Sequence, residues 1–141
     1  MDIFIQSQRH RINPQKAIAQ GGEANIFRLR NGDALKLFKS PDHPDYQTDP
    51  AAQQMACERL AEHQTKLKQF PQGLPPTVVT PIGLACDRSG NILGYTMPWL
   101  DHTVPLMKYG DRTFRQTSGI NCVQRGPSEA ADISPVFTRV L

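Results

Sequence analysis

The amino-acid sequence predicts an α+β fold, in which a five-stranded antiparallel sheet with one packed helix is followed by a partial second lobe. Runs of alternating apolar and polar residues, separated by turn residues, occur in 16–38 and in 77–97. Such runs are typical of half-buried strands. Between them, residues 51–70 contain neither glycine nor proline, and their apolar side chains recur at helical spacing.

The sequence divides into three segments. Residues 1–15 are polar and basic and are expected to form an N-terminal arm, with a short edge strand through Ile3 and Ile5 as the alternative. Residues 16–101 hold the predicted sheet and helix. In residues 102–141 we expect a short helix within 104–116 and then, after Ser118, an irregular tail without periodicity.

The composition and net charge limit the classes of ligand and partner that the chain is expected to bind. The net charge of +3 is too small to indicate a nucleic-acid partner. The first forty residues are more basic than the rest, which suits either a phosphate ligand or a solvated surface. Three widely spaced cysteines give no disulfide framework or metal-ligand pattern, so we expect a reduced, cytoplasmic protein with no bound metal. No apolar run is long enough to span a membrane.

Residues 18–38 are expected to form two successive hairpins. Asn31-Gly32 between alternating runs predicts a tight primed turn with positive φ at both central residues. Gly21-Gly22 offers the same freedom one hairpin earlier. In the last strand Lys36 lies on the face opposite Leu35, so its ammonium group either reaches water or meets an anion.

A helix is expected to begin at Asp49-Pro50, because aspartate is a good N-cap and proline is favoured at the first helical position. Pro71 and Gly73 end it. Its apolar stripe consists of Ala52, Ala56, Leu60, Leu67 and Phe70. The remaining two strands are expected in 77–86 and 91–97, and Pro81 places the first of these at an edge or a bulge.

The stretch 18–38 resembles the glycine-rich loop and third strand of the protein-kinase fold, whose pattern is G-x-G-x-x-G, a β-branched residue and then Ala-x-Lys. Alanine replaces the first and third glycines of that pattern. The positions that carry the resemblance are Ala19, Gly21, Ala24, Ile26 and Ala34-Leu35-Lys36. The resemblance covers residues 16–101 and implies the amino-terminal lobe of a serine/threonine kinase-like protein of bacterial type.

For the phosphates of a nucleotide, the resemblance implies a definite set of contacts. Gly21 and Gly22 are expected over the phosphates, and Lys36 is expected to meet the α- and β-phosphates. The family pairs this lysine with a helix glutamate, for which we favour Glu62 over Glu58. Both glutamates lie off the predicted apolar stripe, so the pairing requires a rotated helix.

For the adenine ring, the resemblance implies a hinge that begins at Met97, the gatekeeper position. The carbonyl of Pro98 is expected to accept a hydrogen bond from adenine, and the N–H of Leu100 to donate one. Proline is compatible with this role because only its carbonyl is needed. The roof of the pocket is expected to consist of Ile18, Ile26 and Ala34.

The catalytic parts of a kinase have no counterpart in the chain. Nothing resembles His-Arg-Asp followed by asparagine, or Asp-Phe-Gly, so the catalytic-loop aspartate and the metal-binding aspartate are missing. We therefore expect a lobe that binds ATP, with Mg²⁺ only if a complete second lobe is present, and that transfers no phosphate by itself. The alternatives are a non-catalytic regulatory or protein-interaction module and an unrelated α+β binding domain.

Overall fold

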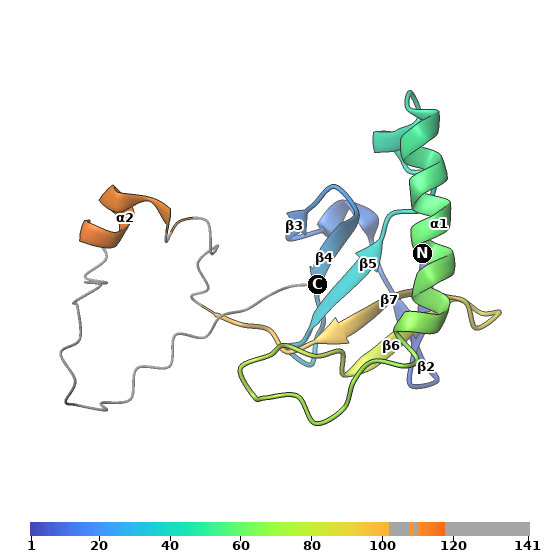
Figure 1. Cartoon of the computed structure of the whole chain (residues 1–141). Helices are drawn as coiled ribbons and strands as arrows, with labels where there is room; N and C mark the ends of the chain where they lie inside the picture. Colours follow the sequence, from blue (N-terminus) through green and yellow to red (C-terminus); the bar gives the residue numbers. More distant parts are fainter. Residues whose placement is uncertain (102–107, 109, 118–141) are drawn as a thin grey trace. The chain divides into compact units, whose positions relative to one another are not determined.

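The structure is a computed structural model that describes residues 1–101, 108 and 110–117. The chain divides into two units (Figure 1). The first consists of Met1–Leu74 and Thr80–Trp99, and the second of Pro75–Val79 and Leu100–Leu141. The first unit contains the sheet and the long helix.

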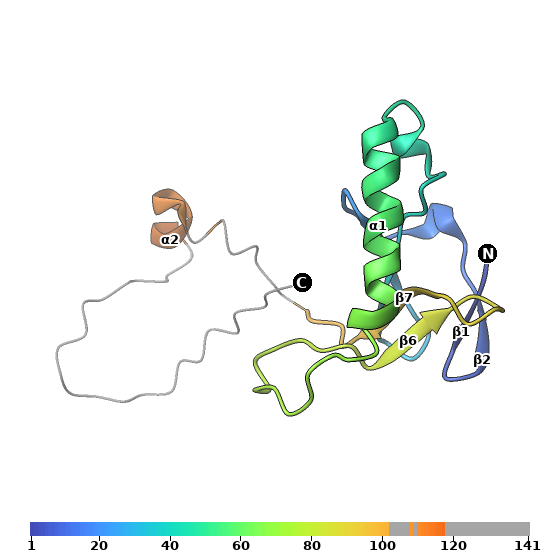
Figure 2. The same cartoon turned by 45° about the vertical axis from the view of Figure 1, so that its right-hand side comes forward.

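The first unit is built on a curled antiparallel sheet of seven strands, in the order β2-β1-β6-β7-β5-β4-β3. Figure 2 shows strands β1, β2, β6 and β7 of this sheet together with helix α1. The strands are β1 (Asp2–Ile5), β2 (Gln8–Arg11), β3 (Ala19–Gln20), β4 (Ala24–Arg28), β5 (Ala34–Phe38), β6 (Gly83–Cys86) and β7 (Ile92–Met97). One long helix, α1 (Pro50–Lys66), accompanies them, with short 3-10 turns η1 (Pro14–Lys16) and η2 (Pro44–Tyr46). The α+β class and the single long helix are confirmed.

The strand count of five was too low, because residues 1–15 are not a loose arm. They form the β1–β2 hairpin and η1, and β1 pairs with β6 through Phe4↔Cys86 and Ile5↔Ala85. The hairpin turn is made by Gln6 and Ser7, with φ of 47° and 67°. Positive φ at two non-glycine residues is uncommon, so this dipeptide gives no usual signal of a primed turn.

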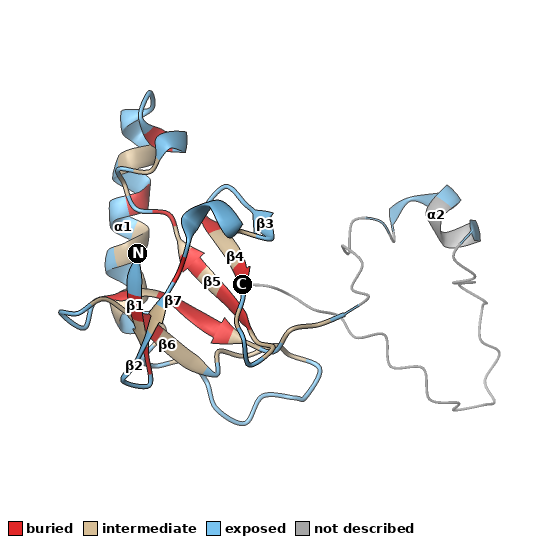
Figure 3. Cartoon of the chain, turned by 180° about the vertical axis from the view of Figure 1, so that it is seen from behind, coloured by how far each residue is buried: buried red, intermediate tan, exposed pale blue. Residues whose placement is uncertain are grey.

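The hydrophobic core lies on the face of the sheet that carries Leu35 and Leu37. Figure 3 shows buried residues along β5 and β7. Because side chains alternate along β5, this is the face opposite Lys36, as the sequence indicated. The β1–β2 hairpin supplies Ile3 and Ile5 to the core, which ties the start of the chain to the sheet. The buried cluster is Ile3, Ile5, Ile12, Phe27, Leu35, Leu37 and Ala85.

Helix α1 begins as expected. The Asp49 side chain accepts hydrogen bonds from the backbone N–H groups of Ala51 and Ala52, both at 3.0 Å, and Pro50 is the first helical residue. The helix ends at Lys66 rather than near Phe70. Phe70 precedes Pro71, and the residue before a proline is sterically disfavoured in helical conformation, which accounts for the exclusion of Phe70 from the helix.

A single side chain joins α1 to the start of β7. The amide of Gln64 donates from Nε2 to the Ile92 carbonyl at 2.9 Å, and its Oε1 accepts from the Ile92 N–H at 2.8 Å. The Gln64 amide thereby makes the two backbone hydrogen bonds to Ile92 that a neighbouring strand would otherwise make. The contact lies next to an irregularity in the β6–β7 register at Ala85/Cys86. This bidentate contact fixes the helix relative to the sheet.

We expect Gln64→Ala to lower the free energy of unfolding by about 2 kcal/mol, since it removes the two part-buried hydrogen bonds to Ile92, each worth about 1 kcal/mol, together with a longer one from Nε2 to the Leu60 carbonyl. Gln54→Ala is the matched control, because Gln54 only donates to Glu58 on the exposed side of the same helix. Urea unfolding measures both. Equal losses in the two variants would contradict a specific role for Gln64.

The two glycine turns differ from the sequence expectation. In the β4–β5 turn only Gly32 has positive φ, at +93°, and its N–H donates to the Leu29 carbonyl at 3.1 Å. This matches a type I turn followed by a left-handed residue rather than a primed turn. At Gly21 and Gly22 φ is not positive, so the turn between β3 and β4 does not use the conformational freedom of glycine.

Strand β6 begins at Gly83, whereas the sequence predicted a start near Thr77. Pro75, Pro76 and Pro81 lack the N–H that a ladder needs, which accounts for the shorter strand. In the second unit the structure describes a turn in which the Val78 N–H donates to the Pro75 carbonyl, and helix α2 (Arg112–Thr117). The predicted helix within 104–116 falls partly on 104–107 and 109, and the predicted tail falls on 118–141, outside the described residues.

Candidate functional site

Cross-strand pairing gathers the expected nucleotide-contacting side chains of the central strands on one face, which we call the Lys36 face. Ile26 pairs directly with Lys36, and Ala34 pairs with Met97. Paired residues in an antiparallel sheet point to the same side, and so do residues two apart on one strand. Ile26, Ala34, Lys36 and Met97 therefore form a contiguous group across β4, β5 and β7.

Lys36 is partly enclosed. It lies on β5, which is next to the central strand β7, and its Nζ is 5.8 Å from the centroid of the Tyr95 ring. Burial lowers the pKa of Lys36 below its ordinary value, and the carboxylate of Glu23 opposes that shift. A partly desolvated ammonium is a stronger partner for an incoming anion than one that is fully hydrated.

The helix residue nearest to this face is His63, not Glu62. Glu62 is exposed and forms an ion pair with Lys66 one turn along α1. The His63 ring stacks on Phe38 of β5, with centroids 4.2 Å apart and an interplanar angle of 16°. Glu58 accepts from Gln54 on the exposed side of the helix. Glu62 thus pairs with Lys66, and the expected contact between Lys36 and Glu62 is not made.

Stacking on Phe38 places the His63 ring where its protonated form is disfavoured. Burial, and next the positive charge of Lys36, lower the pKa of His63 below its ordinary value of 6.5. As pH falls below about 6.5, the unfolded chain therefore binds a proton before the folded chain does. The stability that this difference contributes above pH 6.5 is therefore lost as pH falls through the pKa of His63 in the folded chain.

We expect His63→Phe to reduce this loss of stability in acid, because phenylalanine keeps a ring against Phe38 and cannot be protonated. The measurement is the urea midpoint of both proteins between pH 7.5 and pH 5. The difference between variant and wild type should grow in favour of the variant as pH falls. Parallel pH profiles would contradict the assignment.

The Gly21–Gly22 turn is held by side chains from the segment that follows β5. Lys39, only 4% exposed, donates from Nζ to the Gly21 carbonyl at 2.6 Å and forms an ion pair with Asp45. The Tyr46 hydroxyl donates to the Gly22 carbonyl at 2.5 Å. Both carbonyl oxygens are thus occupied, which fixes the position of the turn relative to β5.

Helix α1 is connected to the same turn. Arg59 lies 3.1 Å from the Glu23 carboxylate and donates to the Tyr46 hydroxyl at 3.3 Å. Together with Lys39, these residues form a network that the sequence analysis did not identify. Its members are separated by up to 36 positions in sequence, and no short motif contains them.

The remaining expected site residues are placed with less enclosure. Ile18 is 52% exposed, and its N–H donates to the Ile26 carbonyl at 2.7 Å. Pro98 follows β7 directly and is exposed. Trp99 has the Arg28 guanidinium 4.9 Å from its ring centroid, a cation–π contact at the end of the Lys36 face. Leu100 belongs to the second unit.

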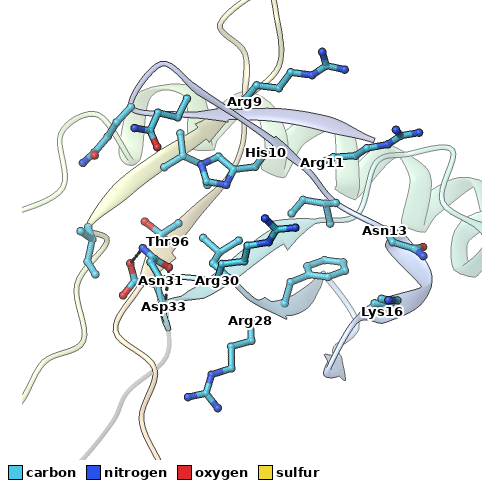
Figure 4. Close-up of a pocket in the computed structure, with 17 residues that line it drawn as sticks. Arg9, His10, Arg11, Asn13, Lys16, Arg28, Arg30, Asn31, Asp33 and Thr96 are labelled. Carbon is cyan, nitrogen blue, oxygen red and sulfur yellow. Dashed lines mark hydrogen bonds between the residues drawn. The ribbon is translucent and has the colours of Figure 1, made fainter.

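A second feature lies on the opposite face of the sheet. A pocket of about 870 Å³ is bounded by the β1–β2 hairpin and by the β4–β5 turn (Figure 4). Its lining includes the core side chains Ile5 and Phe27 and a set of basic residues. Sequence reasoning missed it because the hairpin was expected as an arm. The basic excess of the first forty residues was the available signal.

Comparison of the chain with protein-family models, curated proteins and solved structures found no match. Within the described residues, no helix combines the length and the apolar character needed to cross a membrane. Three or more potential metal ligands do not gather at any point in the described part of the chain. The fold and geometry define an α+β protein with a curled antiparallel sheet and a partly buried lysine on one face.

Proposed function

We propose that the Lys36 face binds ATP, and that the chain is the nucleotide-binding lobe of a serine/threonine kinase-like protein. The observation that carries the proposal is the juxtaposition of Ile26, Ala34, Lys36 and Met97 across three neighbouring strands. Ala34 and its cross-strand partner Met97 are both apolar, so they supply an apolar surface beside Lys36 on this face.

The roles of the residues on this face follow from the chemistry of their side chains. Ile26, Ala34 and Met97 supply an apolar surface for the adenine ring. Lys36 supplies the charge that meets the α- and β-phosphates, and the binding energy of that contact is increased by partial desolvation of the ammonium group. The turn at Gly21 and Gly22, fixed by Lys39 and Tyr46, covers the phosphates.

The proposed activity is binding without transfer. Phosphoryl transfer requires a residue that positions the nucleophile and carboxylates that hold Mg²⁺, and the motifs that supply them in kinases are absent from the sequence. Mg²⁺ would enter only with a complete second lobe. The chain is therefore expected to release no labelled phosphate to a protein acceptor.

Titration calorimetry with ATP tests the proposal on the full chain. Lys36→Ala should weaken binding by about tenfold or more, since a charge-assisted contact to a phosphate is worth about 1.5–3 kcal/mol. Lys66→Ala is the matched control, because Lys66 is an exposed lysine that pairs with Glu62. Equal affinity of wild type and Lys36→Ala would refute a role for Lys36.

A non-catalytic interaction module is the second candidate, and the pocket on the opposite face favours it. That pocket is lined by residues of the first unit only, and its basic side chains suit a charged partner rather than adenine. The two candidates are compatible, because they use different faces of one sheet.

A further inference from the structure

The pocket between the β1–β2 hairpin and the β4–β5 turn carries an excess of positive charge. Among the described residues that line it, the one carboxylate is that of Asp33, which already accepts a hydrogen bond from the Asn31 amide at 2.7 Å. Arg9 is partly neutralised by Asp2. The cationic side chains of the lining are Arg9, Arg11, Lys16, Arg28 and Arg30.

The charges surround an apolar floor. Figure 4 shows Arg30 and His10 near the middle of the pocket and Arg9 and Arg11 extending outward, whereas the Arg28 guanidinium lies over the Trp99 ring. Cations that are spread around an opening suit an elongated partner with several negative charges better than a single phosphate, around which they would converge. The floor consists of Ile5, Ile12, Phe27, Leu29 and Ile82.

Strand β2 adds a backbone component along one wall. It pairs with β1, and within the described sheet it is an edge strand. Edge strands accept extended peptides by main-chain hydrogen bonding, with pockets beside the strand selecting alternate side chains. The sequence of β2, Gln-Arg-His-Arg, places basic side chains along this edge.

Single-stranded nucleic acid fits the pocket less well. Proteins that bind it combine positive charge with exposed aromatic side chains on which the bases stack. Apart from the His10 imidazole, the aromatic side chain in the described lining is Phe27, which is 4% exposed and belongs to the core. An acidic peptide needs no such platform, and its apolar residues match the floor.

We propose that this pocket binds an extended acidic peptide segment of a partner protein, in which glutamate or aspartate alternates with apolar residues. The acidic side chains face the arginine rim, the apolar side chains contact the floor, and the peptide backbone pairs with β2. This proposal does not rest on nucleotide binding, because the pocket lies on the face opposite Lys36.

Fluorescence anisotropy of a short labelled peptide of alternating glutamate and valine, added to the full chain, tests the proposal. The peptide should bind at low salt, and its glutamine counterpart should not. Arg11→Gln combined with Arg30→Gln should weaken binding about tenfold, as expected for the loss of two solvent-accessible ion pairs. Lys68→Gln combined with Arg88→Gln removes the same net charge outside the pocket and should leave the affinity unchanged.

Two results would overturn the proposal. Equal weakening by the two double variants would mean that net charge alone attracts the peptide. Tighter binding of a single-stranded oligothymidine than of the peptide, lost in the Arg11/Arg30 variant, would assign the pocket to nucleic acid instead. Neither result would bear on ATP binding, which is measured separately with Lys36→Ala.

Discussion

Gly94→Ala is expected to destabilise the first unit by about 3 kcal/mol or more, or to prevent its folding. A Cβ atom at position 94 would lie 2.1 Å from the Lys36 carbonyl oxygen and 3.0 Å from the Leu37 Cα. Both atoms are backbone, so no side-chain rotation relieves the clash, and β5 would have to move away from β7.

The matched control for this prediction is Gly22→Ala. A Cβ at position 22 meets no atom within 4 Å, and φ there is not positive. The control is therefore expected to change stability by less than about 1 kcal/mol. Thermal or urea unfolding of both variants provides the comparison. Similar stabilities of the two variants would show that β5 and β7 do not approach as closely as the structure has them.

Lys39→Met is expected to cost about 2–3 kcal/mol, because it removes a buried charge-assisted hydrogen bond to the Gly21 carbonyl together with the ion pair to Asp45. Methionine keeps the length and much of the volume of the side chain, so the loss reports the ammonium group. The same change should also loosen the turn between β3 and β4.

Hydrogen exchange measures that second effect. The Gly21 N–H donates to the Ala24 carbonyl at 2.9 Å, and its protection should fall in Lys39→Met. Lys68→Met, which replaces an exposed lysine, is the control for both measurements. Unchanged stability and unchanged protection at Gly21 in Lys39→Met would mean that Lys39 does not hold the turn.

The two predictions bear on the same question, which is how rigidly the Lys36 face is built. Gly94 sets the spacing between β5 and β7, and Lys39 sets the position of the turn relative to β5. A site that orients a phosphate ester needs both, since displacements of about 1 Å already reduce binding and catalysis. The neighbouring network of Tyr46, Arg59 and Glu23 extends the support to α1.

Much of the first unit could be predicted from local sequence. The alternation around Lys36 assigned β5 and its two faces correctly, and Asp49-Pro50 located the start of α1. Such features depend on neighbours in sequence, so they can be read from it. The resemblance suggested the grouping of Ile26, Ala34 and Met97 with Lys36, and the strand pairing of the structure places these side chains on one face.

The features that sequence did not predict depend on rare conformations or distant contacts. Gln6 and Ser7 form a turn that usually requires glycine or asparagine, so the β1–β2 hairpin and the pocket beside it were missed. The contact of Lys39 with Gly21 joins residues 18 positions apart. The expected Lys36–Glu62 pair required a rotated helix, and the structure instead stacks His63 on Phe38 of β5.

The measurement that tests the central claim most directly is the mapping of ATP-induced amide chemical-shift changes on the full chain. ATP is an anion, so both the Lys36 face and the basic pocket compete for it, and only the location of the changes separates them. The account predicts changes centred on Gly21–Ile26, Lys36 and Met97. Changes confined to the β1–β2 hairpin and the β4–β5 turn, around Arg11 and Arg30, would contradict it.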